Sequence, residues 1–410
     1  MNIREKLRFI EQIDQPKKKS FQLPNDNYTI DKVIDGEIVS LESGETFVRT
    51  LEYDTNTIHG SVSLNQIENV IPDFLKLAGK DTNLLQIDLR NSLFFDTETT
   101  GLAGGSGTYI LLAGFGFFKE NQFILKQFFL RDIPEEFSML KKIHELINQF
   151  DSFVSFNGKS YDLPLLKDRF TLQRIRFNST NYPHLDLLHA SRRVWKNRLP
   201  DCSLGTIERS IMDVFRDGDV PSYLIPELYF EYLRTKDARP LKKVFYHNKI
   251  DILSLVSLTI LLHNIHKNPF ENLPNRSDLL TLTKHYANMN QWKLNIPIYE
   301  NLLDSEINPS VKKELEIQLA FCYKRTGNFD KATQLWHQLV QQGKFRIEPF
   351  EELAKYYEHK TKNLKMASQI VEKALENLNV LEELGSNIYI NQDKQNMIHR
   401  LNRIKTSMAR

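Results

Sequence analysis

The strongest constraint on the fold is one apolar run, Ser92-Leu93-Phe94-Phe95-Asp96-Thr97-Glu98-Thr99-Thr100-Gly101. This composition predicts a β-strand, and side chains in a strand alternate between its two faces. Asp96 and Glu98 therefore share one face, where their like charges repel each other. An isolated Asp-x-Glu is common and indicates only a strand end that enters a turn. The other motifs of the chain are needed to distinguish a strand end from part of a functional site.

Composition limits the class of protein. At 410 residues and 41% hydrophobic content, the chain is too long for one compact core and predicts two or three domains. Its formal net charge of +2 excludes a global attraction to nucleic acid, so any basic surface is local. Cys202 and Cys322 lie far apart and predict neither a disulfide framework nor a zinc site, as in a reducing compartment. Because no signal peptide pattern and no uninterrupted apolar span are evident, we expect a cytoplasmic protein with no membrane partner.

Residues 1–87 predict a small N-terminal α+β extension. A short helix comes first, and the clearest strand covers residues 46–53, with glycines at its borders. This pattern indicates a β hairpin attached to a larger domain.

From residue 88 onward the pattern changes to strands alternating with helices, which predicts an α/β domain over residues 88–267. Three strands linked by hairpins come first, followed by a crossover helix and further strands and helices. We expect strands at 93–98, 109–118, 122–129, 153–156 and 184–188, and helices at 134–150, from 161 or 162, at 203–215, 226–233 and 241–265. This order is typical of a ribonuclease-H-like fold, a mixed sheet with flanking helices.

Residues 268–410 predict an all-α domain that begins with a Pro- and Asn-containing linker. One segment has the spacing of a tetratricopeptide (TPR) repeat, at Ala320, Tyr323, Gly327, Ala332, Trp336 and Leu339. Weaker matches lie one period before and after it. We expect about three TPR-like helical hairpins, with a plain helical bundle as the alternative.

Four acidic residues occur in contexts that favour metal binding: Asp96 and Glu98 on a strand, Asp162 after a turn, and Asp251 on a late helix. Carboxylates are the ligands that Mg²⁺ and Mn²⁺ prefer, and four of them can hold two such ions. His247 lies four residues before Asp251, so on a helix the two share one face. An imidazole there can orient or deprotonate an attacking water, or it can simply pair with Asp251.

The motifs around these acids resemble those of the DnaQ-like (DEDD) 3′-to-5′ exonucleases. Residues 95–102 resemble the first motif, 155–164 the second and 247–251 the third. With its helical-repeat tail, the chain as a whole is similar to the bacterial YprB-type proteins. The resemblance implies a site for two Mg²⁺ or Mn²⁺ ions, with Asp96 bridging both, Glu98 a direct ligand, Asp162 serving one ion and Asp251 the other.

The general base is the part of the motif that differs. DEDD enzymes usually place a Tyr four residues, or a His five residues, before the last Asp. Here His247 occupies the four-residue position and Tyr246 the five-residue position. We expect His247 to activate water, with Tyr246 as the alternative.

Substrate contacts are expected near the carboxylates. The Gly-rich stretch after Glu98 and the turn before Asp162 provide Thr99, Gly101, Leu102, Asn157, Lys159 and Tyr161. Eight basic residues between 167 and 198, among them Arg192 and Arg193, predict a positive face for a phosphate backbone. The interleaved Phe170, Phe177, Tyr182 and Trp195 are candidates for stacking on bases.

These observations predict a metal-dependent nuclease that cleaves DNA or RNA, acting as a 3′-to-5′ exonuclease by a two-metal mechanism. Its partner is nucleic acid that is single-stranded or has a free 3′ end, and the C-terminal repeats are expected to recruit a protein. Two alternatives stay open. One is a non-catalytic nucleic-acid-binding adaptor, and the other is a ribonuclease-H-type endonuclease.

Overall fold

The computed structural model describes residues 28–101, 107–304, 308–342, 345–385 and 388–409. For residues 388–390 it describes the backbone only. The short helix expected at the very N-terminus and the candidate substrate residue Leu102 lie outside the described residues. The chain forms two compact units, one ending at Asn268 and the other beginning at Pro269.

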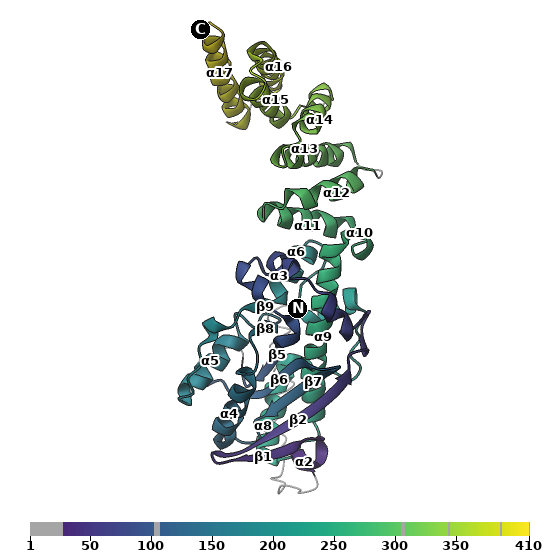
Figure 1. The fold of residues 1–410 in the computed structure, drawn as a ribbon, viewed down its shortest axis with the longest axis vertical. Helices are drawn as coiled ribbons and strands as arrows, with labels where there is room; N and C mark the ends of the chain where they lie inside the picture. Colours follow the sequence, from purple (N-terminus) through teal and green to yellow (C-terminus); the bar gives the residue numbers. More distant parts are fainter. Residues whose placement is uncertain (1–27, 102–106, 305–307, 343–344, 386–387, 410) are drawn as a thin grey trace, which may run out of the picture. The chain divides into compact units, whose positions relative to one another are not determined.

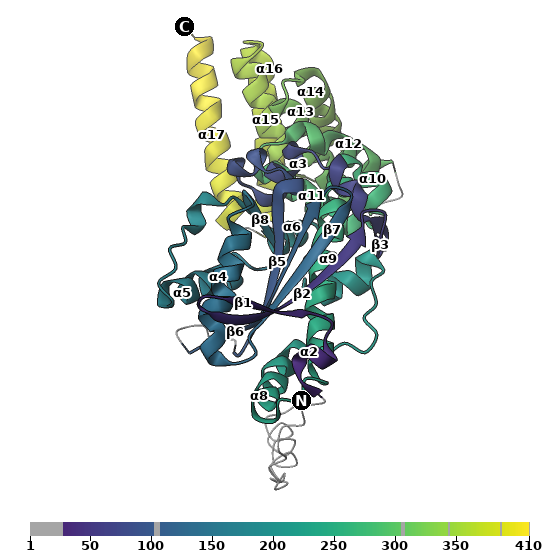
Figure 2. The same ribbon diagram turned by 60° about the horizontal axis from the view of Figure 1, so that its bottom comes forward.

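The first unit is built on a seven-stranded mixed sheet in the order β1-β2-β7-β6-β5-β8-β9 (Figures 1 and 2). The strands are β1 (Glu37–Leu41), β2 (Gly44–Asp54), β5 (Ser92–Thr99), β6 (Ile110–Lys119), β7 (Gln122–Phe129), β8 (Ser152–Ser155) and β9 (His184–Asp186). The neighbouring strands β1, β2, β7, β6 and β5 pair antiparallel in that order, whereas β8 pairs parallel with β5 and with β9. The hairpin expected within residues 1–87 is β1–β2, which extends this same sheet through β7.

Helices cover both faces of the sheet, as expected for the predicted fold class (Figure 2). On one face, α4 (Glu136–Ile147) and α5 (Asp162–Leu172) pack over a core that contains Phe95, Phe115 and Phe153. On the other face, α8 (Ile225–Thr235) and α9 (Leu241–Lys267) pack over Phe47 and Phe129. The sheet therefore has two separate apolar cores, one on each face.

Shorter elements complete the first unit. They are α2 (Ile30–Val33), β3 (Ile58–His59), β4 (Val62–Ser63), α3 (Pro72–Gly79), α6 (Leu187–Trp195), α7 (Leu204–Ile207), a π-helical turn (Glu208–Met212) and 3₁₀ turns at Leu64–Asn69, Thr82–Gln86, Leu89–Asn91, Ile133–Glu135, Ser179–Asn181 and Ser222–Leu224.

One expected strand is too long. The sequence predicted a strand over 184–188, but β9 ends at Asp186 and α6, which was not predicted, begins at the next residue. Asp186 is the reason, because its carboxylate caps the helix by accepting a hydrogen bond from the Leu188 backbone N–H (3.0 Å).

Helix α9 approaches the sheet closely because two glycines of β6 lie beneath it. A Cβ at Gly114 would lie 2.1 Å from the Asn248 side-chain oxygen, and one at Gly116 would lie 2.6 Å from Ile252. By length and composition alone α9 could cross a membrane, but 78% of its most apolar window is buried within the fold. It is a core helix of this unit, and it carries His247 and Asp251.

The described residues of the second unit form helices joined by short turns, and from α11 (Arg276–Asn288) onward each helix packs on the next. Its helices are α10 (Pro269–Asn272), α11 (Arg276–Asn288), α12 (Trp292–Leu303), α13 (Pro309–Arg325), α14 (Phe329–Gln341), α15 (Ile347–His359), α16 (Leu364–Glu383) and α17 (Ile388–Met408). The large and small repeat-spaced side chains, Ala320, Tyr323, Ala332, Trp336 and Leu339, are buried between α13 and its neighbours. Gly327 has φ +83° in the turn between α13 and α14, a conformation that favours glycine.

Candidate active site

Strand β5 places two carboxylates on the α9 face of the sheet. Phe95 packs into the core beneath α4 and α5, so its neighbour Asp96 points to the opposite face, and Glu98 follows it two residues on. The amide of Asn248 on α9 donates to Asp96 Oδ2 (3.0 Å). The predicted shared face of Asp96 and Glu98 is therefore the face that α9 covers.

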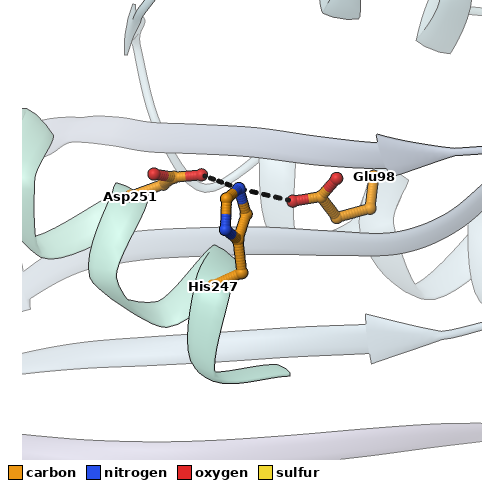
Figure 3. A group of neighbouring side chains, drawn as sticks. All are labelled: Glu98, His247 and Asp251. Atoms are coloured by element: carbon orange, nitrogen blue, oxygen red, sulfur yellow. Dashed lines mark ion pairs between the residues drawn. The ribbon is translucent and has the colours of Figure 1, made fainter. Parts of the chain in front are cut away.

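Helix α9 supplies an imidazole and a third carboxylate, His247 and Asp251, spaced one helical turn apart. The His247 Nε2 atom lies 3.4 Å from Asp251 Oδ2 and 3.8 Å from Glu98 Oε1, so the ring lies between the two carboxylates (Figure 3). One ligand atom from each of the three residues lies within 4.8 Å of the other two. Residues separated by about 150 positions in sequence thus form one compact group.

Asp162 joins the cluster from the other side of β5. It is the first residue of α5, it is 6% exposed, and its Oδ1 accepts hydrogen bonds from the backbone N–H (3.2 Å) and the hydroxyl of Thr97. Thr97 lies between Asp96 and Glu98, so this contact holds Asp162 beside them. The charge of Asp162 contributes to the raised pKa values of both Asp96 and Glu98.

Burial and mutual repulsion make these acids hard to ionise. Burial raises the pKa of Asp96 well above its ordinary range, and the charges of Asp251, Glu98 and Asp162 add to the rise. Burial also raises the pKa of Glu98 to about 8, although the nearby His247 opposes it. For Asp162, burial raises the pKa to about 6 against the hydrogen bonds from Thr97. Perturbed groups gathered at one place are typical of functional sites.

The donor set fits a divalent cation. Carboxylate oxygens are hard ligands suited to Mg²⁺ and Mn²⁺, and a buried group of repelling carboxylates is stabilised by positive charge. The residues that could hold such ions are Asp96, Glu98, Asp162 and Asp251, with His247 within ligand distance of the same group.

The sequence did not reveal the residues that contact His247, Asp251 and Asp96 from outside the cluster. The carboxylate of Asp219 accepts a hydrogen bond from His247 Nδ1 (2.9 Å), which leaves Nε2 directed at Glu98 and Asp251. Burial alone would lower the pKa of His247, but Asp219 and the two other carboxylates raise it to about 9. No spacing rule links positions 219 and 247, so no sequence pattern predicted this pair.

Arg216 is the second missed residue. Its guanidinium binds Glu208 through two hydrogen bonds of 2.6 Å each, and it also contacts Asp251 Oδ1 and Asp219 Oδ2 (3.2 Å). The side chain of Glu208 is only 1% exposed, so this ion pair is buried. Arg216 thereby holds one oxygen of Asp251 and leaves the other, Oδ2, facing His247.

A third missed residue is Asn248. Besides binding Asp96, it accepts a hydrogen bond from Gln127 on β7 (3.0 Å), and it is completely buried. Asn248 directly follows His247 within the third motif, and this position could have indicated that it contacts the site.

Three of the expected substrate residues form one group beside Glu98. The Tyr161 hydroxyl donates to the Gly101 carbonyl oxygen (2.6 Å) and lies 3.0 Å from the Thr99 hydroxyl. Asn157 and Lys159 have exposed side chains, while their backbone N–H groups donate to Asp186 (2.9 and 3.2 Å). Asp186 is thus occupied in shaping this turn and the start of α6.

Two of the four candidate stacking aromatics are ruled out, because Phe170 and Trp195 are completely buried. Phe177 and Tyr182 are half-buried at the edge of the core beneath α4 and α5. The presence of aromatic residues between basic residues in the sequence does not show whether an aromatic side chain lies in the core or on the surface.

The basic stretch between 167 and 198 is also only partly a surface. Arg169 is buried in an ion pair with Glu136 (2.6 Å), and Arg193 donates to the Ala78 carbonyl oxygen. Arg192 is exposed. Arg169 therefore belongs to the core and not to the expected positive face, and Arg193 is held by the last turn of α3.

Two comparisons with known proteins agree with this geometry. A family model described as RNase_H superfamily matches residues 93–263, which span β5 to most of α9. The chain is also 33% identical over 340 residues to YprB of Bacillus subtilis (strain 168), a protein described as uncharacterized, and the match covers 82% of each chain. The sequence, the mixed sheet and the acidic site together show that the chain belongs to the YprB family and carries a ribonuclease H superfamily domain.

Proposed function

We propose that this protein is a metal-dependent 3′-to-5′ exonuclease of the DEDD type that hydrolyses phosphodiester bonds of DNA or RNA with two Mg²⁺ or Mn²⁺ ions. The observation that carries the proposal is the meeting of three distant motifs at β5, with Glu98, His247 and Asp251 within 4.8 Å of one another and Asp96 and Asp162 electrostatically coupled to them. Membership of the ribonuclease H superfamily, whose proteins are generally nucleases, supports it.

In this proposal the four carboxylates, Asp96, Glu98, Asp162 and Asp251, hold the ions. When bound, two divalent ions stabilise the charge on the attacking and leaving oxygens of an in-line displacement. Asn248 holds Asp96 and Arg216 holds Asp251, each through a hydrogen bond to the carboxylate. Such outer partners fix the direction of ligating oxygens.

His247 is the proposed general base. Because Nδ1 donates to Asp219, Nε2 faces the cluster. The pKa of about 9 keeps the ring protonated near neutral pH in the metal-free protein, and the positive charge of bound cations would lower that pKa, so that Nε2 could accept the proton of an attacking water. Tyr246, the alternative base, is half-buried, and Lys249 lies over its ring (4.8 Å). The geometry thus favours His247 over Tyr246.

The end of the strand would be bound beside Glu98. Thr99, Gly101 and Tyr161 form a hydrogen-bonded group there, and the exposed Asn157, Lys159 and Arg192 can reach phosphates. We assign the strand a free 3′ end by analogy with DEDD enzymes. We further propose that the C-terminal helices are TPR-like and bind a protein partner, and that the protein works in the cytoplasm, in keeping with its two free cysteines.

The proposal is tested with single-stranded DNA and RNA labelled at either end and incubated with Mg²⁺, Mn²⁺ or EDTA. We expect stepwise shortening from the 3′ end that depends on metal and falls at least about 100-fold in Asp96→Asn. Asp168→Asn is the matched control, because Asp168 is an exposed acid on α5 outside the cluster. Unchanged cleavage by Asp96→Asn would refute the catalytic assignment.

The same assay separates the alternatives. Circular or end-blocked substrates are resistant to an exonuclease but are cut by a ribonuclease-H-type endonuclease. An adaptor binds these substrates without cutting any of them, and its binding does not require the four carboxylates.

A further inference from the structure

A single loop, residues 213–223, connects the π-helical turn to the start of α8 and faces the site with polar side chains. Arg216 contacts Asp251, Asp219 contacts His247, and the Ser222 hydroxyl lies 3.2 Å from His247 Nε2. The loop therefore touches both functional residues of α9.

The same loop directs two aromatic side chains into solvent. Phe215 is 73% exposed and Tyr223 is 75% exposed. They are the most exposed aromatic side chains among the described residues, since the next, Phe230, is 47% exposed. Rings of this size are normally buried, so two of them exposed on one loop are available for contacts with a ligand.

The exposure does not come from a loose loop. Val214 and Val220 are buried, the Val214 N–H donates to the Glu208 carbonyl oxygen (3.0 Å), and Arg216 is held by the buried Glu208. The backbone next to each ring is therefore fixed before any ligand binds. A pre-organised surface loses little conformational entropy on binding.

Position and charge identify the ligand. Phe215 directly precedes Arg216, which contacts Asp251, and Tyr223 directly follows Ser222, which contacts His247. Both rings thus stand one residue from groups that touch the reacting cluster. Asp213 and Asp217 of the same loop are exposed, and their negative charge disfavours a phosphate backbone on this surface. Neutral base faces stack well on aromatic rings whatever the base.

We propose that Phe215 and Tyr223 form a stacking site for unpaired bases of the strand that is cut, so that the substrate is single-stranded near its end and is bound without sequence preference. This inference rests on the proposed function for the position of the strand. It adds two rings to the aromatic residues that the sequence suggested, of which the fold buries Phe170 and Trp195.

The test measures binding without cleavage, by fluorescence anisotropy in EDTA. Wild-type protein, Phe215→Ala/Tyr223→Ala and the control Phe230→Ala are titrated with a labelled single strand and with an abasic strand of equal length and charge. We expect wild type and the control to prefer the base-containing strand by roughly 10-fold or more, and the double variant to lose this preference while its affinity for the abasic strand is unchanged. Phe215→Trp/Tyr223→Trp should retain the preference.

Two results would overturn the proposal: equal affinity of wild type for the two strands, or a double variant that still prefers bases. The outcomes are separable from those of the cleavage assay. A base preference that depends on the rings, in a protein that cuts nothing, would refute the nuclease and keep the stacking site. Cleavage that depends on Asp96, without any effect of the rings on binding, would refute the stacking site alone.

Discussion

Replacing Glu98 with Gln should make the metal-free protein more stable, although it destroys the proposed site. Glu98 is 8% exposed, and burial raises its pKa from an ordinary value of 4.5 to about 8. A folded-state pKa above the unfolded-state value means that the folded protein binds more protons between these two pH values. Stability therefore falls as pH rises from about 4.5 to about 8.

The size of the effect follows from the same values. A rise from 4.5 to about 8 corresponds to roughly 5 kcal/mol, at about 1.4 kcal/mol for each pH unit. The pKa of about 8 already includes the attraction of the His247 imidazolium, and Glu98 is still partly protonated at pH 8, so we expect a net gain of roughly 2 to 5 kcal/mol at that pH. For a unit of this size that is a rise of roughly 5 to 15 °C in the midpoint of thermal unfolding.

The assay is thermal unfolding in EDTA from pH 5 to pH 9 for wild type, Glu98→Gln and the control Asp168→Asn. Wild type and control should lose stability toward pH 9, in part because His247 also releases its proton between 6.5 and about 9. Glu98→Gln should match wild type near pH 5 and exceed it at pH 8. Adding Mn²⁺ should raise the wild-type midpoint more at pH 8 than at pH 5, since protons compete for the same oxygens.

A wild-type midpoint that stays constant or rises between pH 5 and pH 8 in EDTA would refute this reasoning. So would a Glu98→Gln midpoint that follows wild type at every pH. Either result would mean that the acids are not held close together in a buried site.

Three further predictions concern the residues around the cluster. Arg216→Met should lower stability by roughly 3 to 5 kcal/mol because it leaves the Glu208 carboxylate buried without a cation, and Arg216→Met/Glu208→Gln should recover most of the loss in thermal unfolding. Asp219→Asn should lower the pKa of His247 from about 9 toward 6.5, which is checked by NMR titration with the ring signal assigned through a His247→Gln variant. Gly114→Ala should reduce cleavage at least about 10-fold, since its Cβ would lie 2.1 Å from the amide that holds Asp96; wild-type rates would contradict this.

Local periodicity explains what the sequence could predict. Asp96 and Glu98 share a face because strands have period 2, and His247 and Asp251 share a face because helices have period 3.6. The hairpin-linked strands and the crossover helix follow from equally local patterns, and the mixed sheet with helices on both faces is confirmed. The relative placement of residues within one strand or one helix can therefore be predicted from the sequence.

Contacts between residues on different elements could not be predicted from such local patterns. Asp219 and Arg216 reach α9 from a loop about 30 residues earlier, and Asn248 contacts Asp96 across 152 positions. Phe170 and Trp195 were mistaken for surface residues for the same reason. Whether Trp195 faces solvent or core depends on what packs against α6, and no pattern within residues 167–198 contains that information.

Charge balance connects these missed residues to the proposed pair of ions. Six carboxylates belong to the described cluster, and the two cations in contact with them are Arg216 and His247 when protonated. The six are Asp96, Glu98, Asp162, Glu208, Asp219 and Asp251. Six negative and two positive charges leave −4 if every acid is ionised, and two divalent ions carry +4. One ion would leave two charges to be neutralised by protons, at the raised pKa values of Asp96 and Glu98. Arg216 and His247 offset Glu208 and Asp219 in this count, so the remaining four negative charges are those of the four carboxylates that we propose as ligands, and this balance supports the proposal of two ions.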